Sequence, residues 1–270
     1  MRLALAQLSP AAGAVERNRR RAREAVETAA DRGVDLLALP ELWDVGYFAF
    51  DAYERAAESV AGETLSELAT LADEHDLALV AGTVVEGLAA SAADGIDTPA
   101  EEGLANTAVV FDADGQRRAT YRKHHLFGYE SAEAQLLEPG EALPTAEIGG
   151  FTLGVTTCYD LRFPEQFRAM TDRGVTLVVV PSAWPYPRVE HWQTLPRSRA
   201  VENLAYVAAV NGVGTVADGD LLGRSTVYDP WGTTVAAAAT EPTLITAEID
   251  PERVTTVREE FTALDDRRSY

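Results

Sequence analysis

The segment from Gly154 to Phe167, GVTTCYDLRFPEQF, joins an apolar run to a helix start and favours an α/β fold. Gly154 to Thr157 are expected to end a buried strand. Pro164 suits the first turn of a helix, because the N–H that proline lacks would have no partner there. Cys158 stands at the corner between the two elements, where its thiol is expected to face a cleft. The Tyr159 N–H can then face whatever the sulfur attacks.

Apolar runs and helix-like segments alternate along the rest of the chain. Strands are predicted at Leu3–Leu8, Val34–Leu39, Leu77–Val85, Ala105–Asp112, Gln116–Tyr121, Val175–Val180, Leu204–Val210, Ser225–Tyr228, Thr233–Ala238 and Leu244–Ile249. Helices are predicted at about Val15–Arg32, Thr64–Glu74 and Glu190–Glu202, with Thr64 as the N-cap of the second. The acidic stretch Glu86–Gly103 is expected to be a surface loop. This pattern predicts a mixed α/β protein and leaves open whether it has one sheet or two.

Length and charge narrow the class of protein. The chain has 270 residues and no linker rich in Pro, Ser or Gly, so a single domain over residues 1–270 is expected. Its formal charge of −20 repels phosphate and anionic membranes, and neither nucleic acid nor membrane is an expected partner. Because no apolar span or signal-peptide pattern is found, we expect a soluble cytoplasmic protein.

The basic residues are almost all arginine. Lys+Arg total 23, and Lys123 is the only lysine among them. Scarce lysine together with abundant acidic residues is typical of proteins kept soluble in a salt-rich, halophilic cytoplasm. A lysine that persists in such a chain indicates a need for a compact ammonium, which arginine cannot supply.

Three reactive side chains stand at or just after predicted strand ends: Glu41, Lys123 and Cys158. The ends of neighbouring strands meet along one edge of an α/β sheet, where ligands usually bind. There the thiol is a natural nucleophile, Glu41 a base and Lys123 a donor to a developing oxyanion. Structural alternatives are a buried apolar cysteine, a carboxylate at a helix N-terminus and a surface cation.

The segments around these residues resemble the nitrilase superfamily of carbon–nitrogen hydrolases. The likeness rests on LALPELW at Glu41, YRKHHLFG at Lys123 and TTCYDLRFPEQF at Cys158, and it extends over nearly the full chain. It implies a four-layer α-β-β-α sandwich, an amide-hydrolysing thioester mechanism and a homodimer or larger homo-oligomer. It also implies that Glu133, in EAQLLEPG, assists the Glu41, Lys123 and Cys158 triad.

Within that superfamily, the sequence PSAWPYPRVEHWQTLPRSRAVENLAYVAAVNGVG is similar to the omega-amidase branch. This likeness implies hydrolysis of a small carboxylated amide such as 2-oxoglutaramate, with release of ammonia. Candidate substrate-binding residues are Tyr159, Arg162, Trp184 and Arg188. The two arginines suit a substrate carboxylate, although Arg162 could equally form a structural ion pair. The two aromatic residues could equally be part of the hydrophobic core. N-carbamoyl amino acid or nitrile hydrolysis stays an alternative, because LLGRST at residues 221–226 departs from the branch pattern.

No cofactor or metal is expected, since the four histidines, at positions 75, 124, 125 and 191, lack metal-ligand spacing. His124 and His125 leave open a Cys-His protease. A non-catalytic binding subunit with this fold is a further alternative, and the presence of all three reactive groups disfavours it.

Overall fold

Two six-stranded β-sheets stack face to face in the computed structural model, which describes residues 1–128 and 131–268. The first sheet has the strand order β14-β1-β2-β3-β4-β5 and the second β13-β12-β9-β8-β7-β6. The first sheet contains β1 (Arg2–Gln7), β2 (Leu36–Ala38), β3 (Ala78–Gly87), β4 (Leu104–Phe111), β5 (Arg117–Arg122) and β14 (Thr243–Glu248). The second sheet contains β6 (Thr145–Ile148), β7 (Phe151–Val155), β8 (Leu177–Ser182), β9 (Tyr206–Asn211), β12 (Thr226–Tyr228) and β13 (Thr234–Ala237). Strands β10 (Val213–Val216) and β11 (Gly219–Leu222) form a separate hairpin.

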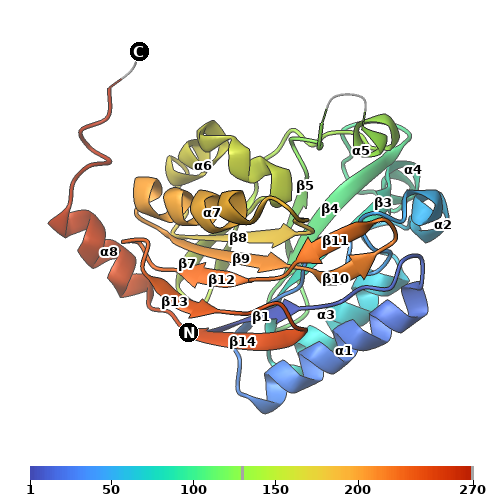
Figure 1. Ribbon diagram of the computed structural model, residues 1–270, viewed down its shortest axis with the longest axis horizontal. Helices are drawn as coiled ribbons and strands as arrows, with labels where there is room; N and C mark the ends of the chain where they lie inside the picture. Colours follow the sequence, from blue (N-terminus) through green and yellow to red (C-terminus); the bar gives the residue numbers. More distant parts are fainter. Residues whose placement is uncertain (129–130, 269–270) are drawn as a thin grey trace.

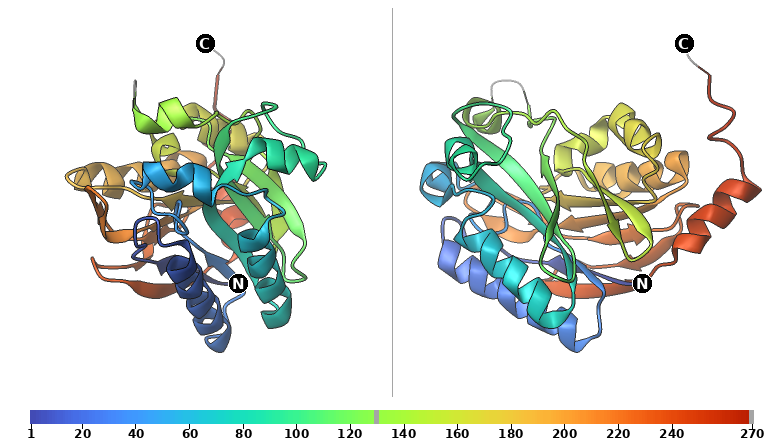
Figure 2. Two further views of the ribbon diagram at one scale, coloured as in Figure 1. Left: turned by 90° about the vertical axis from the view of Figure 1, so that its right-hand side faces the viewer. Right: turned by 180° about the vertical axis from the view of Figure 1, so that it is seen from behind.

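The structure contains the helices α1 (Val15–Asp31), α2 (Tyr53–Ala56), α3 (Glu63–His75), α4 (Leu88–Ala93), α5 (Ala132–Leu136), α6 (Pro164–Thr171), α7 (Val189–Asn203) and α8 (Pro251–Glu260), and the 3₁₀ turns η1 (Phe50–Ala52) and η2 (Cys158–Arg162). Four of these helices cover the outer faces of the two sheets (Figure 1). Helices α1 and α3 lie side by side against the first sheet, and α6 and α7 lie against the second (Figure 2). The four-layer α-β-β-α arrangement is therefore confirmed, and it settles the question of one sheet or two.

Strand β1 illustrates why the apolar runs are continuous. Leu3 and Leu5 pack into the core between the two sheets, whereas Ala4 and Ala6 pack into the layer beneath the helices. A strand buried on both faces needs no polar alternation, so its sequence is apolar throughout. Burial of a leucine side chain of this kind stabilises the fold by about 1.5–3 kcal/mol.

Each sheet is built around three parallel strands. In the first sheet β1, β2 and β3 run parallel, with α1 between the first two and α3 between the last two. In the second sheet β7, β8 and β9 repeat this arrangement with α6 and α7. The outer strands pair antiparallel. Ligand sites form at the carboxyl ends of such parallel strands, which is where Glu41 and Cys158 lie.

Two local predictions are wrong. Helix α3 begins at Glu63 with Gly62 as its N-cap, so Thr64 lies inside the first turn and does not cap it. Its N–H instead donates to the Glu58 carboxylate at 3.1 Å, because a side chain from the preceding loop reaches the helix end. The expected surface loop at Glu86–Gly103 begins in β3 and contains α4. Glu86 is fully buried, where Arg122 forms a 2.7 Å ion pair with its carboxylate.

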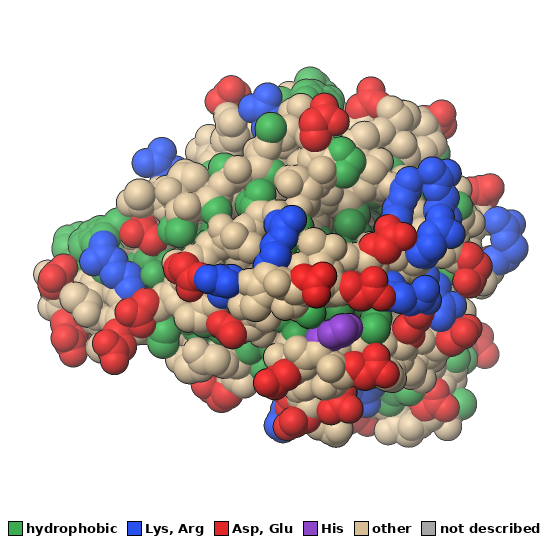
Figure 3. Space-filling model, turned by 90° about the horizontal axis from the view of Figure 1, so that it is seen from below, with side chains coloured by type: hydrophobic (Ala, Val, Ile, Leu, Met, Phe, Trp, Pro, Cys, Tyr) green, Lys and Arg blue, Asp and Glu red, His purple; other side chains and the backbone are tan. Residues whose placement is uncertain are grey.

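The surface reflects the acidic composition. On the face seen from below, acidic side chains are spread widely, with arginines among them (Figure 3). The arginine-rich helix α1 uses part of its charge internally, since Arg19 and Arg23 pair with Glu67 of α3. This pairing agrees with a charged helix face rather than a nucleic-acid patch. Within the described residues, no helix is long and apolar enough to cross a membrane.

Candidate active site

Cys158 begins the turn η2, just after strand β7 ends at Val155. Its backbone φ is 46°, a left-handed conformation that costs a non-glycine residue about 1–3 kcal/mol. The residue is 7% exposed, and it lines a cavity of about 370 Å³. Helix α6 starts at Pro164, as predicted. The strand-to-helix corner thus turns its thiol toward a cavity.

Glu41 follows strand β2 by way of Pro40, and Pro40 packs against a β-bulge in strand β3. The register of β3 shifts between Val80 and Thr83, and Gly82 has a φ of 64°. A Cβ at Gly82 would lie 2.2 Å from the Pro40 carbonyl oxygen, so glycine is required there. The Thr83 N–H donates to the same carbonyl at 3.2 Å. The bulge therefore holds the segment that carries Glu41 against the sheet.

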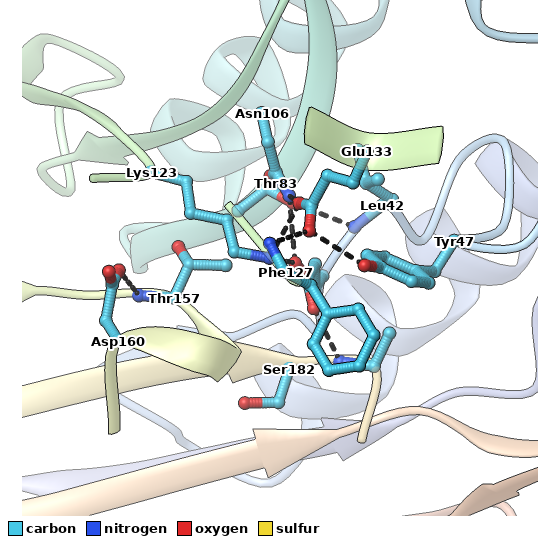
Figure 4. A network of polar contacts seen from close by, with 12 residues as sticks. Leu42, Tyr47, Thr83, Asn106, Lys123, Phe127, Glu133, Thr157, Asp160 and Ser182 are labelled. Carbon is cyan, nitrogen blue, oxygen red and sulfur yellow. Dashed lines mark hydrogen bonds and ion pairs between the residues drawn. The ribbon is translucent and has the colours of Figure 1, made fainter. Parts of the chain in front are cut away.

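One ammonium and two carboxylates form the centre of the site. Figure 4 shows Lys123 and Glu133 pointing toward one another. Lys123 Nζ donates to Glu41 Oε1 at 2.8 Å and to Glu133 Oε1 at 2.7 Å. The other Glu133 oxygen accepts from the Tyr47 hydroxyl at 2.8 Å and from the Phe127 N–H at 2.7 Å. All three charged residues are at most 1% exposed. The alternative that Lys123 is a surface cation is therefore wrong.

Glu41 is fixed by donors from both sheets. Its Oε1 accepts from Asn106 Nδ2 at 2.8 Å, and its Oε2 accepts from the Ala183 N–H at 2.8 Å. The Cys158 thiol lies close enough to the Glu41 carboxylate for each group to shift the pKa of the other. The carboxylate of Glu41 therefore connects the ammonium of Lys123 to the sulfur.

Burial and charge set the protonation of the three reactive groups. Burial raises the pKa of the Cys158 thiol well above its usual value, and the nearby Glu41 carboxylate raises it further. Burial also raises the pKa of Glu41, although the Lys123 ammonium opposes this shift. Burial lowers the pKa of Lys123, but Glu133 and Glu41 more than offset this effect, and the pKa lies well above its usual value. The resting site therefore has a neutral thiol beside a charged ammonium.

A neutral thiol beside a carboxylate of raised pKa is suited to attack that is coupled to proton transfer. A base is effective when its pKa lies near the working pH, and burial shifts Glu41 in that direction. A permanent ammonium nearby stabilises negative charge as it develops. Across the described residues, no group of three or more His, Cys, Asp or Glu side chains is arranged to hold a metal ion.

Of the candidate substrate-binding residues, Arg188 lies in the wall of the cavity. It lines the cavity together with Cys158, and its guanidinium lies 5.3 Å from the centre of the Phe127 ring. The hairpin β10–β11 forms another wall, where Gly219 approaches Phe48 so closely that an added Cβ would lie 2.1 Å from the ring. This hairpin was not predicted from the sequence.

Arg162 occupies a different environment from Arg188. Its guanidinium lies 5.5 Å from the Tyr159 ring centre and 5.1 Å from the Trp184 ring centre, and Nη2 is 3.2 Å from His191 Nδ1. Trp184 is 2% exposed and belongs to the core beneath α6 and α7, where its ring packs 5.7 Å from that of Trp192. Tyr159, Arg162 and Trp184 thus form one cluster next to the nucleophile corner.

Sequence reasoning missed several residues of the site. One is Asn106, which with its neighbour Thr107 interrupts the otherwise apolar strand LANTAVVF, and that interruption was an available signal. Tyr47 gave no comparable signal, because it lies in an irregular segment. Asp160 is also buried beside Cys158, although in the sequence it looks like one more acidic residue.

This fold and this buried thiol, carboxylates and ammonium match a known class of enzyme. The sequence matches the carbon-nitrogen hydrolase family over residues 2–259, and the chain belongs to that family. The resemblance found in the sequence is therefore confirmed.

Individual relatives narrow the comparison. The chain is 36% identical to a 2-oxoglutaramate amidase of Paenarthrobacter nicotinovorans, over 87% of this chain and 79% of that protein. It is 32% identical to an omega-amidase of Homo sapiens, over 99% of this chain and 95% of that protein. Among solved structures, Saccharomyces cerevisiae Nit3, a member of branch 10 of the nitrilase superfamily, matches with a TM-score of 0.85 at 31% identity, covering 96% of this chain and 93% of that one.

Proposed function

We propose that the protein hydrolyses the terminal amide of a small carboxylated amide, such as 2-oxoglutaramate, through a thioester on Cys158. The observation that carries this proposal is that Cys158 and Arg188 line one cavity of about 370 Å³, with Glu41 near enough to raise the pKa of the thiol. A nucleophile and a cation in one cavity suit an amide that bears a carboxylate at its other end. The relatives named 2-oxoglutaramate amidase and omega-amidase support the same substrate class.

The reaction proceeds in two halves. The Cys158 sulfur attacks the amide carbon while its proton passes to Glu41, and the oxygen becomes negative. Lys123 and the Tyr159 N–H stabilise that oxyanion, to which one donor typically contributes about 3–4 kcal/mol of barrier lowering. The C–N bond then breaks, ammonia leaves with the proton from Glu41, and the thioester remains. Water next gives a proton to Glu41 and attacks the thioester, and that proton returns to the departing sulfur.

Glu133 holds the ammonium of Lys123 in this scheme. Its contact with Lys123 Nζ is 2.7 Å, and the Tyr47 hydroxyl fixes its other oxygen. Arg188 takes the substrate carboxylate from the cavity wall. Arg162, with Tyr159 and Trp184, supports the same end of the site from behind the nucleophile corner.

The test combines product analysis with loss of the nucleophile. Purified protein is incubated with 2-oxoglutaramate, an N-carbamoyl amino acid and an aliphatic nitrile, and released ammonia is measured. We expect fastest turnover with the carboxylated amide, and an acyl adduct on Cys158 by intact-mass spectrometry. Cys158→Ala is expected to be folded and inactive. Faster turnover of the carbamoyl compound or the nitrile, or an active Cys158→Ala, would contradict the proposal.

The molecule is further proposed to act as one domain, residues 1–270, in a homodimer or larger homo-oligomer. Exposed apolar side chains support self-association: Val201, Trp231 and Phe261 are 48%, 40% and 50% exposed, and the last two rings lie 5.7 Å apart. The charge of −20 and the single lysine support a cytoplasm of high salt as its location. Light scattering in 0.2 M and in molar KCl measures the oligomeric state, and activity followed alongside tests the preference for high salt.

A further inference from the structure

A buried carboxylate beside the nucleophile has no part in the steps above. Asp160 lies two residues after Cys158 in the turn η2, and it is fully buried. Its two oxygens accept hydrogen bonds from two segments of chain that are far apart in sequence. A buried carboxylate is costly unless such bonds satisfy it, so their arrangement is informative.

The first segment is the one that carries the nucleophile. The Thr157 N–H, immediately before Cys158, donates to Asp160 Oδ2 at 2.9 Å (Figure 4). This bond closes the corner at which Cys158 adopts its left-handed φ of 46°. A strained conformation of this kind persists only where neighbouring contacts hold it.

The second segment is the one that carries the ammonium. Tyr121 and His125 stand two residues before and two residues after Lys123, and both contact the same carboxylate. The Tyr121 hydroxyl donates to Oδ2 at 2.5 Å, and the His125 N–H donates to Oδ1 at 3.0 Å. His125 Nδ1 also lies 2.7 Å from Oδ1.

Further contacts hold this bridge in place. The Tyr121 hydroxyl accepts from Gln166 Nε2 of α6 at 2.8 Å and from the His124 N–H at 3.2 Å. The His125 ring stacks on Phe163, with centroids 3.6 Å apart and planes within 9°. The bridge is thus tied to strand β5 on one side and to helix α6 on the other.

We propose that Asp160 is a positioning residue for hydrolysis, whose carboxylate fixes the Cys158 corner relative to the Lys123 segment. The inference rests on the proposed function, because it takes Cys158 as nucleophile and Lys123 as oxyanion donor. Within the site, Glu41 already links the ammonium of Lys123 to the sulfur. Asp160 supplies a second bridge, from the Cys158 corner after strand β7 to the residues that flank Lys123. An error of about 1 Å between reacting groups can cost on the order of 100-fold in rate.

Asp160→Asn is the main test. The amide keeps the shape, but one of its two ends must present N–H to donors that the carboxylate accepted. We expect kcat to fall about 10- to 100-fold with KM within about threefold, in protein shown to be folded by circular dichroism and assayed well below its Tm. Tyr121→Phe, which removes one bond to Asp160, should lower kcat less. The double variant should lose less than the product of the two single losses, because both act through one contact.

A matched control separates positioning from stability. Asp112→Asn alters another carboxylate with several bonds, to the Asp114 and Gln116 N–H groups and to Arg118, at the far turn of β4–β5. It should lower Tm and leave kcat unchanged. Near-normal kcat in Asp160→Asn, or in Tyr121→Phe if Asp160→Asn does not fold, would overturn the inference. Absence of amide turnover in the unaltered protein would instead contradict the proposed function.

Discussion

Lys123 and Glu41 form a 2.8 Å ion pair across 82 positions of sequence, with neither residue more than 1% exposed. A second carboxylate, Glu133, shares the same ammonium at 2.7 Å. Burying these charges costs several kcal/mol for each ion before the pairing offsets it, and apolar residues in their place are often as stable. The cluster is therefore better explained by chemistry than by stability.

Replacement of the sole lysine by arginine tests this explanation. Lys123→Arg keeps the charge, but the larger planar guanidinium cannot occupy the space of an ammonium bonded to two carboxylates. We expect turnover to fall at least about 100-fold, equivalent to roughly 2.7 kcal/mol of barrier. Because the larger group must fit a fully buried space, Tm should fall as well, so turnover is compared well below the Tm of the variant. Steady-state kinetics in high-salt buffer provide the measurement. Arg20→Lys, at an exposed position of α1, is the reciprocal control and should retain full activity. Near-normal turnover in Lys123→Arg would make the lysine an accident of composition.

Glu41→Gln tests the base. The amide keeps most of the shape of the carboxylate but cannot take the thiol proton, and general base catalysis typically contributes about 100- to 10,000-fold. We expect the rate of acyl-enzyme formation to fall within that range, as followed by rapid quench and mass spectrometry. Glu54→Gln, at an exposed position of helix α2, should behave as wild type. Acylation at the wild-type rate in Glu41→Gln would remove Glu41 from this role.

Arginine variants test the site for the substrate carboxylate. A charge-assisted hydrogen bond contributes about 1.5–3 kcal/mol, so Arg188→Gln should raise KM for the carboxylated amide roughly 10- to 100-fold. An uncharged amide of the same length should be affected little. Arg162→Gln should have a smaller effect on KM, because Arg162 packs against Tyr159 and Trp184 and is not part of the cavity wall that contains Arg188. Equal losses on charged and uncharged amides in Arg188→Gln would contradict a role in charge recognition.

Stability is expected to depend on pH through Asp44. Burial raises the pKa of this carboxyl to about 7 from an ordinary 3.8. The folded state therefore favours the protonated form, and the free energy of unfolding falls as pH rises from about 4 to about 7. Asp44→Asn should match wild type at about pH 4, and at pH 8 it should be more stable by up to about 4 kcal/mol. Urea unfolding at both pH values measures the difference. The exposed Asp114→Asn is the control, and an equal effect of Asp44→Asn at both pH values would exclude this cause.

How far the sequence predicts this molecule depends on how local each signal is. Apolar runs ending at Pro40 and Thr157 place Glu41 and Cys158 at strand ends, because a buried strand is a run of consecutive apolar residues. The two-sheet arrangement came from the family resemblance, since strand pairing between distant segments leaves no local pattern. The burial of Glu86 was missed because its partner Arg122 belongs to another strand.

The same distinction applies to the site. Lys123 stood out by composition alone, whereas the bonds from Asn106 to Glu41 and from Tyr47 to Glu133 exist only after folding brings the segments together. The bulge at Gly82 also depends on a close approach to Pro40 that periodicity cannot reveal. Sequence therefore predicts which groups are candidates for the reaction, and the fold determines what holds them.

The candidate reactive groups come from opposite halves of the chain, so their contact depends on how the two halves assemble. Glu41, Lys123 and Glu133 belong to the first half of the chain, and Cys158 with the Ala183 N–H belongs to the second. The packing of one sheet on the other brings them into contact, and the second half also supplies β14, which pairs with β1 in the first sheet. A chain cut between the halves is therefore expected to give two inert fragments, and ammonia release would serve as a direct gauge of whether the two halves have rejoined.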